Sequence, residues 1–176
     1  MTEVDDDNES IKAIRTAIEI EIVGLETFQK YAEQTKSEAG KKVFLQLAKD
    51  EKRHREILED QLNKLTEGKP WEDVEIPASE IEQVVPKLRE RAVETKGEAG
   101  AGEIDALNAA LDLEKRASEF FREKAEQAEE PEAKALFLRL AEWEDSHYDL
   151  IKAELDSINH SGFWFDIREF RMDAMY

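Results

Sequence analysis

The chain has 176 residues, of which 43 are acidic and 25 basic, so its net charge is −18, and it has no cysteine. Such a charge repels phosphate backbones and anionic membrane surfaces, which argues against nucleic acid or a membrane as a partner. Without cysteine there are no disulfides, thiolate nucleophiles or thiolate-held clusters, so any metal must bind to oxygen and imidazole.

The length suits one domain with a sizeable core, and we expect a single domain over residues 1–176. The sequence contains no long uncharged apolar run that would cross a membrane. Its first ten residues, MTEVDDDNES, are acidic and lack the basic start and apolar centre of a secretory signal. We therefore expect a cytoplasmic protein.

Two helices are predicted at about 9–36 and 39–66, where they form a first helical hairpin. Apolar residues recur there at steps of three and four, as they do in a buried seam. Polar residues interrupt both seams, Glu21 in the first helix and the pair Glu51 and His54 in the second. The apolar members of the two seams are Ile11, Ile14, Ile18, Leu25, Phe28 and Ala32, then Phe44, Leu47 and Leu58.

Residues 67–102 are expected to form a long crossover linker. Three of the four prolines and four of the seven glycines lie between residues 66 and 103, and both residue types interrupt helices. A weaker helical segment is predicted near 79–94, where Pro86 interrupts it. No strand pattern competes with the helices anywhere in the chain.

A second hairpin is predicted from helices at about 103–129 and 131–159. Its seams also contain polar residues, Glu114 in the first helix and the pair Glu144 and His147 in the second. The other members of these seams are Ile104, Leu107, Leu111, Ser118 and Phe121, then Phe137, Leu140 and Ile151.

An aromatic tail at 160–176 follows the last predicted helix. We expect it to fold back over one end of the helices and complete the core, with a docking peptide for a partner as the alternative. His160 is expected to cap the free carbonyls at the end of that helix and is not counted in any site.

The two hairpins, 9–66 and 103–159, match each other at a shift of 93 residues. A duplicated hairpin whose two copies bury their apolar faces together predicts an all-α fold, a four-helix bundle with one long crossover. The shift superposes Glu21 on Glu114, Glu51 on Glu144 and His54 on His147, and among apolar residues Ile11 on Ile104, Phe28 on Phe121, Phe44 on Phe137 and Leu47 on Leu140.

Six polar residues therefore occupy seam positions: Glu21, Glu51, His54, Glu114, Glu144 and His147. Because residues three or four apart share a helix face, all of them should point into the bundle at similar heights. Buried carboxylates without partners would cost roughly several kcal/mol each. Two divalent cations would balance the four negative charges, which predicts a dinuclear metal site.

The alternative is that these residues are surface charges or core salt bridges. A single Glu-x-x-His on a charged helix is weak support for a site, since glutamate is common in this chain. Two copies in register, each with a seam glutamate thirty residues earlier, favour the metal site.

At these residues the sequence resembles the ferritin-like di-iron carboxylate proteins, and among them the rubrerythrin family, over roughly residues 10–160. The resemblance implies a ferritin-like bundle that holds two metal ions, iron first and manganese as the alternative. It also implies ligand roles, with Glu21 and Glu114 terminal, Glu51 and Glu144 bridging, and His54 and His147 each capping one metal.

The chain departs from the family pattern in three respects. Rubrerythrins usually carry a rubredoxin module whose cysteines deliver electrons, so a chain without cysteine implies an external electron-donor protein. Ala117 replaces an extra glutamate, which argues against redox-linked ligand exchange, and Phe28 and Phe121 replace tyrosines that usually hydrogen-bond the site. Trp143 and Tyr148, which adjoin ligands, are expected to pack, with hydrogen bonding or electron transfer as the alternative.

The resemblance implies an oxidoreductase that reduces hydrogen peroxide or dioxygen at a dinuclear metal site with electrons from the external donor. Three alternatives stay open: a ferroxidase serving iron storage, a dimanganese catalase, and a non-catalytic metal-binding or interaction module. Because the long crossover allows hairpins to be exchanged between subunits, we expect a homodimer.

Overall fold

The computed structural model describes residues 9–82 and 95–165. Four long helices make up most of the described residues, α1 (Glu9–Gln34), α2 (Glu38–Thr66), α4 (Ala101–Gln127) and α5 (Pro131–Ser161). All of their ends lie within two residues of the predicted bounds, so the all-α fold is confirmed. The predicted linker helix near 79–94 is helical at residues 80–82, and its remainder lies outside the described residues.

Local sequence signals account for most of the helix ends. Ser37 precedes α2, and its hydroxyl accepts a hydrogen bond from a backbone N–H of the first turn. The N–H of Gly100 donates to the carboxylate of Glu103 at the start of α4. Pro131 opens α5, where no intrahelical donor is lost, and Gly162 ends it with φ of +81°.

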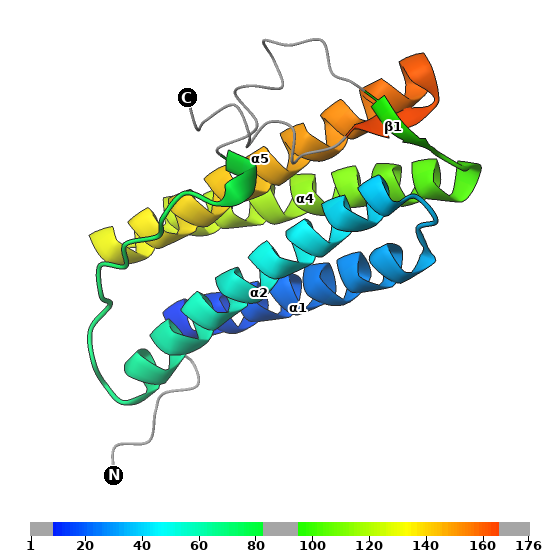
Figure 1. Ribbon diagram of the computed structural model, residues 1–176. Coiled ribbons are helices and arrows are strands. Elements are labelled where there is room, and N and C mark those ends of the chain that lie inside the picture. Colours follow the sequence, from blue (N-terminus) through cyan, green and yellow to red (C-terminus); the bar gives the residue numbers. More distant parts are fainter. Residues whose placement is uncertain (1–8, 83–94, 166–176) are drawn as a thin grey trace, which may run out of the picture.

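The helices pack as two hairpins that lie side by side (Figure 1). The blue α1 packs along the cyan α2, and α4 packs along α5, while α1 also contacts α4. The crossover returns along α5, where Trp71 and Ile76 are buried and the guanidinium of Arg139 donates to the carboxylate of Glu82 at 2.8 Å. None of the described helices has the length and apolarity needed to span a bilayer.

Among the described residues, the buried apolar side chains form two clusters. The polar seam positions of each long helix lie between members of the two clusters, so the bundle has two apolar ends and a polar waist. One cluster includes Leu25, Phe28, Phe44, Leu47, Leu107 and Ile151, and the other includes Ile14, Leu58, Phe121, Phe137, Leu140 and Trp143.

Two short strands, β1 (Thr95–Glu98) and β2 (Phe163–Phe165), pair antiparallel with Thr95 opposite Phe165. The expectation that the chain contains no strand was therefore wrong at this point. A strand of three residues is too short to show a period of two in its sequence, and the left-handed turn at Gly162 brings it beside β1.

The described part of the tail completes the core, as expected. Trp164 and Phe165 are almost fully buried and join the cluster that contains Phe44. His160 lies within α5 and not beyond it, and its Nδ1 atom is 2.7 Å from the carbonyl oxygen of Asp156, one turn earlier. The predicted cap of the free carbonyls at the helix end therefore stays a prediction. Residues 166–176 lie outside the described part of the chain.

Glu103 joins three segments at this end of the bundle. Its carboxylate accepts hydrogen bonds from the backbone N–H groups of Lys36 at 2.8 Å, Ser37 at 3.2 Å and Gly100 at 2.8 Å, and from the indole of Trp164 at 3.5 Å. A single buried carboxylate thus ties the α1–α2 turn to the start of α4 and to β2.

Candidate metal centre

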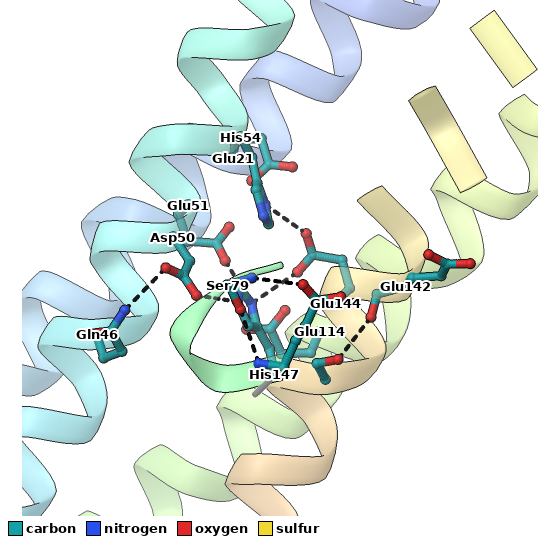
Figure 2. A network of polar contacts seen from close by, with 12 residues as sticks. Glu21, Gln46, Asp50, Glu51, His54, Ser79, Glu114, Glu142, Glu144 and His147 are labelled. Carbon is teal, nitrogen blue, oxygen red and sulfur yellow. Dashed lines mark hydrogen bonds and ion pairs between the residues drawn. The ribbon is translucent and has the colours of Figure 1, made fainter. Parts of the chain in front are cut away.

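The structure brings the predicted site residues together at the waist of the bundle. Each long helix contributes to the group, which Figure 2 shows as side chains converging from both hairpins. All are at most 2% exposed: Glu21, Glu51, His54, Glu114, Glu144 and His147.

Two overlapping groups of ligand atoms are present, and within each group the atoms lie within 4.8 Å of one another. Glu51 and Glu144 belong to both groups. The first group adds Glu21 and His54, and the second adds Glu114 and His147. Each group therefore offers one glutamate and one histidine of its own and shares two carboxylates with the other, which is the arrangement that two bridged metal ions require.

Each histidine contacts the glutamate of the other hairpin that belongs to both groups. The Nδ1 atom of His54 on α2 lies 3.0 Å from Glu144 Oε1 on α5 and 3.1 Å from Glu21 Oε2. The Nδ1 atom of His147 on α5 lies 3.1 Å from Glu51 Oε1 on α2. The same Nδ1 atom is 3.3 Å from Glu144 and 3.4 Å from Glu114.

Burial and mutual repulsion change the acidity of these carboxyl groups. Burial raises the pKa of Glu21 well above its ordinary value, and the charges of Glu51 and Glu144 raise it further. Burial and the charge of Glu144 likewise raise the pKa of Glu114. Burial also acts to raise the pKa of Glu144, but the neighbouring imidazoles, His54 first, bring it below its ordinary value.

His147 is the basic counterpart of this cluster. Burial acts to lower its pKa, but the facing carboxylates, Glu114 first, raise that pKa well above its ordinary value. Protons thus compensate the carboxylates when no cation does. Because metal ligands must be deprotonated, a metal that binds here displaces those protons.

Hydrogen bonding within the described residues does not satisfy the cluster. Buried polar atoms almost always have a partner, and carboxylate oxygens with imidazole nitrogens are ligands that iron and manganese accept. The residues present therefore fit a dinuclear metal site. Among the six predicted ligands, the buried atoms without a hydrogen-bond partner in the described part of the chain are Glu21 Oε1, Glu51 Oε1, both oxygens of Glu114 and of Glu144, His54 Nε2 and His147 Nδ1.

Gly24, which sequence reasoning did not single out, makes room for one ligand. A Cβ atom at this position would lie 2.6 Å from Glu51 Oε2, so a larger residue would displace the carboxylate. The matching residue of the second hairpin is the buried Ala117. A signal was available, since a glycine in a helix interior is destabilising and this one follows Glu21 by three residues.

Asp50 is the second residue that sequence reasoning missed. It directly precedes Glu51 and is buried, with its Oδ2 atom 3.3 Å from His147 Nε2. Its matching residue, Trp143, packs on His54 with ring centroids 4.2 Å apart, which confirms the predicted packing role. Only the position of Asp50 beside a ligand could have indicated its contact, because that contact crosses between hairpins.

The aromatic residues near the site make its surroundings apolar. Phe28 and Phe121 are fully buried, one in each apolar cluster. The indole Nε1 of Trp143 has no hydrogen-bond partner among the described residues. These side chains keep water away from the carboxylates on both sides of the waist.

Comparison with known proteins identifies the family and fold to which this chain is similar. Residues 12–155, which include all of the predicted ligands, match the Rubrerythrin family. A solved structure of a hypothetical protein from Pyrococcus furiosus is 26% identical, with a TM-score of 0.66 over 90% of this chain and 95% of that chain. Among curated proteins, none is similar enough in sequence to match.

A second solved structure shows the fold alone. It is a two-domain protein from Anabaena variabilis with DJ-1/ThiJ/PfpI-like and ferritin-like domains. It is 17% identical, with a TM-score of 0.64 over 87% of this chain and 37% of that chain. The family match, the repeated hairpins and the buried carboxylate and histidine cluster agree, and the chain belongs to the rubrerythrin family of ferritin-like proteins.

Proposed function

We propose that the protein holds two iron ions at its waist and reduces hydrogen peroxide or dioxygen with electrons from an external donor protein. The observation that carries this proposal is the set of buried ligand atoms that lack hydrogen-bond partners in the described chain. Four carboxylates balance two divalent cations. Two adjacent redox-active ions supply two electrons together, which is what the cleavage of one peroxide O–O bond consumes.

The protein's own contribution is geometry, exclusion of water and control of protons. Glu51 and Glu144 belong to both groups of ligand atoms and would set the spacing of two bound ions, while His54 and His147 would each hold one of them. Reduction of one hydrogen peroxide to two water molecules takes two electrons and two protons. In the metal-free centre burial raises the pKa of Glu114, so this carboxyl would give up its proton when an ion binds.

Metal binding is the first test. Metal-free protein is titrated with ferrous iron without oxygen, and two ions per chain are expected by equilibrium dialysis and elemental analysis. Glu114→Gln should bind fewer than two ions per chain or bind them more weakly. The matched variant Glu119→Gln, at an exposed position on the same helix, should still bind two ions. Two ions bound equally well by both variants would contradict the assignment of Glu114.

The reaction is the second test. The reduced, iron-loaded protein is mixed with hydrogen peroxide, and its ultraviolet and visible absorption should change as two electrons per centre are consumed. An absorption that stays constant would refute the proposal. Ferric mineral formed from excess ferrous iron would instead indicate iron storage, and oxygen released without added reductant would indicate a manganese catalase.

The external donor and a homodimer are also proposed. The chain has no cysteine and therefore no thiolate-held electron-transfer group of its own. Because this chain has a net charge of −18, its electron donor is expected to present a basic face. Reduction of the oxidised centre should then slow as the salt concentration rises. Analytical sedimentation should give the mass of a dimer, and the mass of a monomer would contradict the proposed homodimer.

A further inference from the structure

The two hairpins are alike in sequence, yet they do not surround the two metal positions alike. Asp50 and Trp143 occupy matching places, because each directly precedes a bridging glutamate and they are separated by the repeat shift of 93 residues. Each faces the capping histidine of the opposite hairpin. One of these histidines therefore meets a carboxylate and the other an indole.

Asp50 fixes both the orientation and the tautomer of His147. Its Oδ2 atom lies 3.3 Å from His147 Nε2, and its Oδ1 atom accepts a hydrogen bond from Gln46 at 3.1 Å (Figure 2). With Nε2 donating to Asp50, Nδ1, which faces the carboxylates of Glu51, Glu114 and Glu144, would be the nitrogen that binds an ion held among them. A carboxylate behind a ligating imidazole also makes that imidazole a stronger ligand.

Trp143 gives His54 no such support. The two rings are tilted by 44°, and among the described residues neither His54 Nε2 nor Trp143 Nε1 has a hydrogen-bond partner. The guanidinium of Arg139 also lies over the indole, 5.6 Å from the ring centroid, and it offers no acceptor. The orientation of His54 therefore rests on packing and on its contacts with Glu21 and Glu144.

We propose that Asp50 is a positioning residue that makes the two metal positions unequal, so that the His147 position fills first and binds its ion at least about tenfold more tightly than the His54 position. The inference rests on the proposed metal-binding function. It adds an order of filling and identifies the second ion as the exchangeable one.

A purely structural role for Asp50 makes a different prediction. The contact with His147 joins α2 to α5, so its loss would then lower the stability of the metal-free protein and weaken both metal positions together. A positioning role affects mainly the first binding step. The two roles are separated by measuring each binding constant and the unfolding temperature without metal.

The experiment is a titration of the metal-free full chain with Co²⁺, followed by calorimetry and by the visible absorption of the bound ion. The wild type should show two resolved steps. Asp50→Ala should weaken the first step by about 10- to 100-fold and bring the two constants together. Asp50→Asn, which keeps a hydrogen-bond acceptor without the charge, should restore part of the difference, and the exposed Asp60→Ala should change nothing.

Two further variants assign the steps to positions. His54→Ala should keep the tighter step and its absorption bands, and His147→Ala should keep only the weaker step. Two equal steps in the wild type, or an undiminished separation in Asp50→Ala, would overturn the inference and leave the dinuclear site standing. If the wild type bound no Co²⁺, Mn²⁺ or Fe²⁺, the proposed function would fall as well.

Discussion

Glu103 at one end of the bundle and Glu114 at its waist lie on the same helix, about three turns apart, and both are buried. The backbone N–H groups of Lys36, Ser37 and Gly100 donate to Glu103. Neither oxygen of Glu114 has a hydrogen-bond partner in the described residues. Burial acts to raise both pKa values, but the donors, Gly100 first, bring the pKa of Glu103 below its ordinary value, whereas that of Glu114 stays well above.

The difference shows that burial alone does not mark a carboxylate as functional. Glu103 is supplied with donors by the fold, so its charge is stable in place and its role is structural. Glu114 is surrounded by other carboxylates and imidazoles, so its charge is stable only beside a cation.

The largest expected effect is the response of stability to metal. An ion at about a thousand times its dissociation constant should stabilise the fold by about 4 kcal/mol, which raises the unfolding temperature of a chain of this size by about 10 °C. Differential scanning calorimetry with Mn²⁺, which resists oxidation, measures this gain.

Glu114→Gln is the control for the metal response. The neutral amide replaces a carboxyl group whose ionisation burial disfavours, so the metal-free variant should unfold at or above the temperature of the wild type. It should lose most of the gain produced by Mn²⁺. A metal-free Glu114→Gln that unfolds well below the wild type would mean that Glu114 stabilises the fold as Glu103 does.

Glu103→Ala should show the reverse behaviour. It leaves three backbone N–H groups and one indole N–H without their acceptor, which should cost about 3 kcal/mol of unfolding free energy. The binding of two metal ions should be unchanged, because Glu103 lies away from the waist. Urea denaturation and metal titration on the same sample check both points, and a loss of metal binding in the folded variant would contradict the separation of roles.

The fold was predictable because its pattern is periodic and written twice. Seam residues such as Phe28 and Phe121, each at its helical spacing and at the repeat shift, define the helices and the hairpins. The same argument placed Glu21 and Glu114 inside the bundle, and the structure brings them to the waist with the other predicted ligands. Their binding of metal stays a prediction.

Features that depend on contacts between distant segments were not predictable. The contact of Asp50 with His147 crosses hairpins, and the pairing of β1 with β2 joins the crossover to the tail. In the sequence nothing distinguishes Glu103 from any other glutamate near the start of a helix. Only the tertiary structure shows that donors from three segments converge on it.

The pH dependence of stability should also separate the two carboxylates. Because the folded pKa of Glu103 is below its unfolded value, its contribution is complete above the unfolded value near 4.3 and is lost as pH falls below it. Because the folded pKa of Glu114 is raised, its contribution in metal-free protein is present at low pH and is lost as pH rises.

Urea denaturation between pH 3 and pH 8 measures this dependence, with metal removed by a chelator. Glu103→Ala should reduce the fall in unfolding free energy that the wild type shows toward acid pH. This reduction should be smaller than the total unfolding free energy that the variant loses at neutral pH. Glu114→Gln should flatten the decline toward alkaline pH. If the fall toward acid pH were the same in Glu103→Ala as in the wild type, the hydrogen-bond donors around Glu103 would not be stabilising its ionised form.

The smallest effects are expected from two glycines that face the two regions. A Cβ atom at Gly40 would lie 2.5 Å from the ring of Trp164, which is fixed in the core beside Glu103. Gly40→Ala should therefore cost about 1 kcal/mol, because overpacking outweighs the gain in helix propensity, with metal binding unchanged.

Gly24→Ala meets the flexible end of Glu51 instead, 2.6 Å from the new Cβ atom. The carboxylate can rotate away, so the stability of the metal-free protein should hardly change and can even rise slightly through helix propensity. Displacing a shared ligand should nevertheless weaken metal binding by about tenfold. Opposite outcomes in this pair, with stability lost at Gly24 and metal affinity lost at Gly40, would show that the division between a packed end and a cation-dependent waist is wrong.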